Sequence, residues 1–188
     1  MVFKNLKSTK STRFLLLLTM SLVIGIANAA VFYSLALSPT VTITDPAVLF
    51  VAGDDYPSGS AIGDNSSTVS LSLAAYPNIT LTYEEPLNIS NTDGVSHDFR
   101  LRHTAISPAS GQAQVGNFSY ICFTILDAVG SSQAVFNYTT TGNTWNTPTT
   151  TSYMTLPAST QWTVYVETKA AASANDVAAS MTIAVDVQ

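Results

Sequence analysis

"STVSLSL", residues 67–73, alternates from Thr68 onward between small hydroxyl side chains and branched apolar ones. This period of two predicts a β-strand with one buried and one exposed face, because successive side chains of a strand point to opposite faces. The same pattern recurs in QWTVYVET (161–168) and MTIAVDV (181–187). Strands therefore dominate the predicted fold.

Further segments with strand character are separated by turn signals rich in Gly, Pro, Ser and Asn. They are NITLTY (78–83), PLNI (86–89), HDFRLRH (97–103), YICFTIL (120–126), AVFNYT (134–139) and SYMTL (152–156). No segment has a convincing helical period. We therefore predict an all-β fold, a β-sandwich in which Cys122 of YICFTIL is a small buried hydrophobe.

The first 29 residues predict a signal peptide. A basic start, from Lys4 to Arg13, precedes an apolar core over residues 14–26, and Ala27-Asn28-Ala29 fits the small-x-small cleavage pattern. Cleavage there predicts a secreted protein whose N-terminal segment is residues 30–38, followed by one domain over residues 39–188.

One alternative keeps residues 14–37 as a membrane-length helix, as in type IV pilin-like or other membrane-anchored proteins. No charge occurs from Phe14 to Thr44, which permits this reading. Ser38 and Pro39, together with the strand spacing of the apolar residues, favour cleavage.

The charge balance after residue 29 is strongly acidic. All 12 acidic residues of the chain lie there with three basic ones, Arg100, Arg102 and Lys169, which gives a net charge of −9. A nucleic-acid partner is therefore not expected.

Five N-glycosylation sequons predict a glycosylated surface protein. Their asparagines are Asn65, Asn78, Asn88, Asn117 and Asn137.

The sequence predicts no enzyme activity, no cofactor and no metal site. His97 and His103 lie six strand residues, about 20 Å, apart, so they cannot bind one ion. Asp54, Asp55 and Asp64 share a glycine-punctuated loop that lacks the spacing of a calcium-binding EF-hand, and an ordinary solvated loop is the preferred interpretation. No nucleophile motif or phosphate-binding loop is present.

The N-terminal segment at residues 30–38 can complete its own sandwich or that of a neighbour. It is uncharged, ends before Pro39, and alternates apolar residues with small ones, so we predict a donor strand that adds to the sheet edge of another copy. The side chains that would fill the neighbour's pockets are Val31, Tyr33, Leu35 and Leu37.

The run from Pro46 to Arg102, after a signal peptide and an alternating apolar start, resembles subunits of archaeal surface filaments. The thread pilus subunits are nearest, and the bundling-pilus proteins related to bacterial biofilm-matrix fibres are more distant. This resemblance implies an immunoglobulin-like, type I pilin-like sandwich polymerised through its N-terminal donor strand, with N-glycans outside.

Two classes of function remain at this point. The first is a structural subunit of an extracellular glycosylated filament that serves adhesion or biofilm formation, with copies of itself and other cells or surfaces as partners. The second is a monomeric secreted β-sandwich that binds a carbohydrate or another surface protein.

Overall fold

A computed structural model describes residues 17–20, 46–175 and 177–188. Residues 17–20 are helical, and the compact unit Thr44–Gln188 holds the strands. Within the described residues, no helix is long and apolar enough to cross a membrane. The predicted signal-peptide cleavage and donor segment lie outside the described residues.

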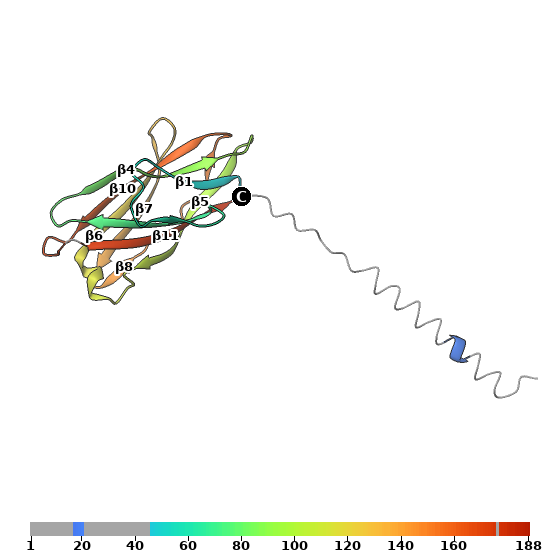
Figure 1. Cartoon of the computed structure of the whole chain (residues 1–188), viewed down its shortest axis with the longest axis horizontal. Coiled ribbons are helices and arrows are strands. Elements are labelled where there is room, and N and C mark those ends of the chain that lie inside the picture. Colours follow the sequence, from blue (N-terminus) through green and yellow to red (C-terminus); the bar gives the residue numbers. More distant parts are fainter. Residues whose placement is uncertain (1–16, 21–45, 176) are drawn as a thin grey trace, which may run out of the picture. The chain divides into compact units, whose positions relative to one another are not determined.

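The strands form two antiparallel sheets that pack as a sandwich-like all-β fold (Figure 1). One sheet has the order β1 (Val48–Ala52), β4 (Leu81–Asn91), β10 (Gln161–Ala170), β6 (Phe118–Leu126), β7 (Ser132–Thr141) and β8 (Thr144–Asn146). The other has the order β2 (Ala61–Ile62), β3 (Thr68–Ala75), β11 (Val177–Val187), β5 (His97–Ser107) and β9 (Met154–Leu156). A short 3-10 helix, η1 (Ala113–Asn117), precedes β6.

The alternating residues supply the core, as predicted. In β3, Val69, Leu71 and Leu73 are at most 1% exposed, while the serines between them lie on the outer face. In β10, Trp162 packs edge-to-face on Phe99 of β5, with 5.6 Å between ring centroids, and so joins the two sheets. The period of two therefore indicates correctly which side chains lie between the sheets.

Three strands lie where the sequence pattern predicts none. β1 is a continuous apolar run, and β2 and β8 are two- and three-residue strands inside segments with turn signals. All three are edge strands. Such short pieces are set by contact with the neighbouring strand and not by their own periodicity.

The interpretation of Cys122 as a core residue is wrong. Ile121 and Phe123, on either side of it, point into the core, so the thiol lies on the outer face of β6 and is half-buried. Partial burial still raises the pKa of the Cys122 thiol. Ile79 also departs from the pattern, since it lies in the turn before β4 and is 62% exposed.

Trp145 fixes the connection between β5 and β6. Its indole Nε1 donates to the carbonyl oxygen of Pro108 at 2.8 Å, and its backbone N donates to Oγ of Ser110 at 3.0 Å. Its ring lies 5.1 Å from that of Phe118. These contacts hold residues 108–117 against β8 and define one end of the sandwich.

Candidate functional site

The predicted donor side chains, Val31, Tyr33, Leu35 and Leu37, lie outside the described residues. The structure does describe the surfaces that an added strand could use, which are the edges of the two sheets. A strand edge carries backbone N–H and C=O groups on its outer side, and those groups favour pairing with another chain.

Most of the outer edge of β7, next to the terminal strand β8, is free. The strand has ten residues, and β8 pairs with only three of them, Thr139 to Thr141. β6 pairs with the inner side of this strand, and in the part of the chain that the structure describes no strand lies on the outer side of residues 132–138, which we call the β7 edge. Seven residues of backbone are thus available for pairing.

The chain leaves the β7 edge because residues 147–153, called the strap here, change sheets. The strap connects β8 to β9, which pairs with β5. Midway along it, Thr151 donates its N–H to the carbonyl oxygen of Leu101 at 3.0 Å and accepts from the Leu101 N–H through Oγ1 at 2.9 Å. The strap therefore follows β5 in the second sheet.

A hollow of about 330 Å³ separates the β7 edge from the strap. Gln133, Ala134 and Val135 line it on the strand side, and residues 149–154 line it on the other. Val135 is 58% exposed. The space beside the β7 edge, where the side chains of an added strand would lie, is therefore not filled by the domain itself.

The interior beneath this edge is aromatic. Phe136 and Tyr138 of β7 are fully buried and pack edge-to-face on each other and on Phe123. Tyr138 Oη lies 3.0 Å from Nδ1 of His103 on β5. Burial raises the pKa of Tyr138 and lowers the pKa of His103, so this link between the sheets joins two neutral groups at neutral pH.

The composition of the β7 edge is unusual for a free edge. Natural edges are commonly protected by lysine, proline or inward-pointing charges. The sequence SQAVFNY at residues 132–138 has no charged residue and no proline. That signal was available in the sequence, but it did not show that these residues would lack a strand on their outer side.

The glycosylation sequons differ in accessibility. Asn65, Asn78 and Asn137 are exposed, and Asn117 at the end of η1 is half-buried. Asn88 is 2% exposed, and its Nδ2 donates to Oε1 of Glu85 at 2.6 Å. The nitrogen that would carry a glycan on Asn88 is thus buried and already bonded.

We predict that Asn65, Asn78 and Asn137 carry glycan and that Asn88 does not. The acceptor nitrogen must reach a transferase, and the folded domain exposes it in the first three side chains. Glycopeptide mass spectrometry of the protein from its native source measures the occupancy of each site. A glycan on Asn88, or bare asparagine at all three exposed positions, would contradict the prediction.

The glycine-punctuated loop does not gather its carboxylates into a metal site. Asp55 Oδ2 accepts from the N–H of Glu84 at 2.9 Å, and Asp55 N donates to the carbonyl oxygen of Glu85 at 3.0 Å, which ties the loop to β4. Asp64 instead borders a separate hollow. Among the described residues, no three His, Cys, Asp or Glu side chains could hold one ion together.

The two histidines have separate partners. His97 Nε2 lies 2.9 Å from Oδ2 of Asp93, and this hydrogen bond lowers the pKa of the Asp93 carboxyl. His103 contacts Tyr138, as described above. The structure therefore does not bring the histidines together.

Two of the three basic residues of the domain share one carboxylate. Nε of Arg100 lies 3.3 Å from Oδ2 of Asp186, and Nη2 of Arg102 lies 3.3 Å from Oδ1 of the same carboxylate. Hydrogen bonding to Arg102 is the main cause of the lowered pKa of Asp186. The Arg100 guanidinium also lies 4.9 Å from the ring centre of Tyr153. These cations are thus engaged within the domain.

Comparison with known proteins identifies no family. No family model matches the chain. No curated protein matches it either. Among solved structures it is similar to the enzymatically active domain of tailspike protein 4 of bacteriophage CBA120, with a TM-score of 0.28 and 10% identity over 78% of this chain. This chain spans 20% of that protein, and so low a similarity carries no argument.

Proposed function

We propose that this chain is the subunit of an extracellular glycosylated filament that polymerises head to tail by donor-strand complementation. Residues 30–38 of one copy, the donor segment, would add to the β7 edge of the next. Within the sandwich-like class, we propose an immunoglobulin-like, type I pilin-like arrangement that the donor segment completes. The observation that carries the proposal is a seven-residue strand edge that is uncharged and lies above an aromatic interior.

The donor segment suits this edge in length and chemistry. Seven strand residues extend about 23 Å and nine extend about 30 Å, so the segment can span the whole β7 edge. Backbone hydrogen bonds would give affinity, and alternate apolar side chains would enter the hollow beside the edge. No side chain of the donor segment or of the β7 edge carries a charge that would have to be desolvated.

The expected binding energy is sufficient for a stable polymer. Burying Val31, Tyr33, Leu35 and Leu37 contributes about 1.5–3 kcal/mol each, or roughly 6–12 kcal/mol before the entropy of ordering the segment is subtracted. A segment of one copy that binds a different surface of the next makes a heterologous contact, which propagates as a filament when it does not close.

Glycan at Asn137 is compatible with this arrangement. The residue is exposed on β7, and the neighbouring Phe136 and Tyr138 point into the core. Because strand side chains stand roughly perpendicular to the sheet, a glycan there projects away from the face and leaves the backbone edge free. Filaments with sugar on their outer faces are suited to contact other cells or surfaces.

A charge in the donor segment tests the proposal. Leu35→Asp is made in a chain whose C-terminus carries, after a flexible linker, a second copy of residues 30–44 that can occupy its own β7 edge. We expect a folded, soluble monomer that forms no filaments by electron microscopy, because an unpaired carboxylate in an apolar groove costs several kcal/mol.

Ser34→Asp is the matched control, and it is compared with Leu35→Asp in the chain without the second copy, whose β7 edge stays open to a neighbour. It adds the same charge one residue away, on the opposite face of the strand, and filaments should persist. Polymerisation of the Leu35→Asp variant, or equal loss of filaments in both variants, would exclude donor-strand assembly through this segment.

A further inference from the structure

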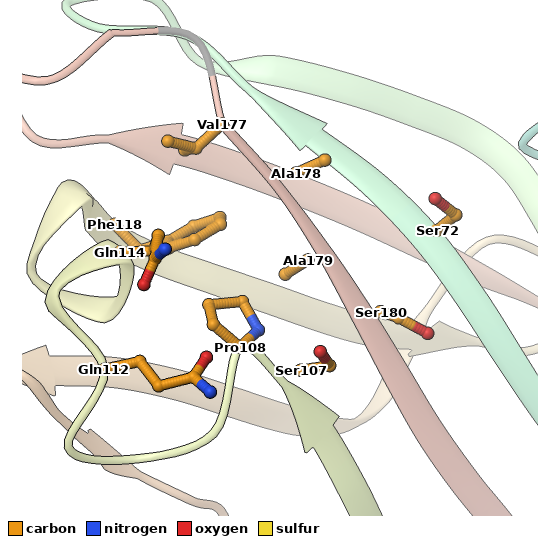
Figure 2. A pocket seen from close by; sticks show the side chains of 10 residues that line it. All are labelled: Ser72, Ser107, Pro108, Gln112, Gln114, Phe118, Val177, Ala178, Ala179 and Ser180. Atoms are coloured by element: carbon orange, nitrogen blue, oxygen red, sulfur yellow. The ribbon is translucent and has the colours of Figure 1, made fainter.

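We infer that a hollow beside β11, the β11 pocket, binds a neutral pyranose sugar ring. The pocket lies where β11 continues beyond the end of β5. The ladder between these strands ends at the pair Ser180 and Ser107, so residues 177–179 of β11 have no strand on that side in the described chain. Residues 108–118 turn away and form the opposite wall, as Figure 2 shows.

The pocket has the size and the firm walls of a small-molecule site. Its volume is about 540 Å³, within the range of about 300–1,000 Å³ that such sites occupy. The wall formed by residues 108–118 is held by the hydrogen bonds from Trp145 to Pro108 and Ser110 and by the ring contact of Trp145 with Phe118. The site is therefore formed before a ligand arrives.

Free polar groups surround this space. Figure 2 shows the side-chain amides of Gln112 and Gln114 and the hydroxyl of Ser107 around the hollow. None of these three side chains forms a hydrogen bond with the described part of the chain. Each amide has two N–H donors and one oxygen acceptor, which can match the donor and acceptor capacity of sugar hydroxyls.

The remaining lining is apolar or small, and it carries no charge. Pro108, Val177 and Ala178 offer apolar surface for the C–H face of a sugar ring, and Ser72 and Ser180 add hydroxyl groups. Among the described residues, no Asp, Glu, Lys or Arg lines the pocket. Charged ligands would enter without a counter-ion, so the pocket favours a neutral polyhydroxyl compound.

The shape of the pocket favours a ring over an added peptide strand. A peptide that paired with residues 177–179 would continue the line of β5, but Pro108 follows Ser107 directly and closes that end. About three residues of strand would fit before this block. A compact sugar ring fills the space without extending past Pro108.

This site is independent of polymerisation, because no residue of the β7 edge or the strap lines it. The sugar can come from an N-glycan on another copy of the chain or from an external polysaccharide. Both sources present the same neutral ring chemistry.

Saturation-transfer difference NMR tests the inference on the full protein, whether filamentous or monomeric. The probes are D-glucose, D-galactose, D-mannose and N-acetyl-D-glucosamine, with D-glucuronate as the charged counterpart of glucose. We expect saturation transfer to at least one neutral sugar and much less to glucuronate. Ala178→Trp fills the pocket from an exposed position and should weaken the response by about tenfold or more.

Ala105→Trp is the matched control, since Ala105 is exposed on β5 of the same sheet and does not line the pocket. It should leave the response unchanged. A response that appears on the native protein only after chemical deglycosylation would identify glycans of the chain as the occupant, and an equal response before and after would identify an external sugar. No response to any neutral sugar, equal binding of glucuronate, or an Ala178→Trp variant that still binds would overturn the inference.

Discussion

Replacing Asn91 with aspartate is expected to destabilise the domain by about 3 kcal/mol or more. Asn91 is 2% exposed, and its Nδ2 lies 2.8 Å from the carbonyl oxygen of Val95, 3.2 Å from that of Leu156 and 3.0 Å from that of Pro157. Aspartate has the same shape, but it turns a donor into a charged acceptor that faces three carbonyl oxygens. The Asn91 amide thus joins β4 to the turn after β9, and the variant breaks that connection.

Urea denaturation followed by the fluorescence of Trp145 and Trp162 measures this loss, since both indoles are buried in the native domain. Folding should raise the pKa of an aspartate at position 91 above its unfolded value, so the destabilisation is complete at neutral pH and decreases as pH falls through that raised pKa. Asn146→Asp, at an exposed asparagine, is the matched control and should change stability by less than about 0.5 kcal/mol. Equal urea midpoints for the two variants would refute the prediction.

Replacing Ala134 with lysine is expected to reduce filament assembly about 100-fold or more. Ala134 is half-buried, packs against the core and lines the hollow beside the β7 edge. A docked donor segment would cover its side chain, and an ammonium trapped there without a counter-ion costs several kcal/mol, where about 1.4 kcal/mol corresponds to a tenfold change. Before assembly the flexible lysine stem can carry its charge to solvent over the open edge, so the subunit should remain folded.

Ala172→Lys is the matched control for this prediction. Ala172 is exposed in the turn after β10, lies outside the β7 edge and does not line the hollow, so the same substitution there should leave assembly unchanged. Sedimentation and electron microscopy compare the assembled fraction of both variants at equal concentration. If the Ala134→Lys protein assembles as well as the Ala172→Lys protein, the β7 edge is not the accepting surface.

Much of the candidate polymerisation surface could not be derived from the sequence, because a free edge is defined by a strand that is absent. AVFNYT predicts a strand, and Phe136 and Tyr138 do point inward. Nothing in that segment indicates that β8 would end after three residues or that the strap would cross to β5. The crossing depends on Thr151 meeting Leu101, two residues 50 positions apart in sequence.

The two asparagines of β4 illustrate the same limit. Asn88 belongs to a sequon and was expected on the surface, yet it is buried beside Glu85. Asn91 carries no motif, yet it forms hydrogen bonds with the carbonyl groups of Leu156 and Pro157, which lie 65 and 66 positions away in sequence. A side chain's partners across the sandwich depend on long-range pairing, which local composition does not encode.

The sequence by itself determined that the described domain is built from strands and, where apolar and polar residues alternate, which side chains enter its core. Alternation such as that of Val69, Leu71 and Leu73 acts within a single strand, since the pleat sends successive side chains to opposite faces. The same alternation of Ile121, Phe123 and Ile125 places Cys122 on the outer face of β6. Tertiary structure alone decided where strands end beside their neighbours, and hence the β7 edge and the β11 pocket. These features arise from pairing between residues far apart in the chain, where hydrogen-bond register and the packing of two sheets outweigh local preference.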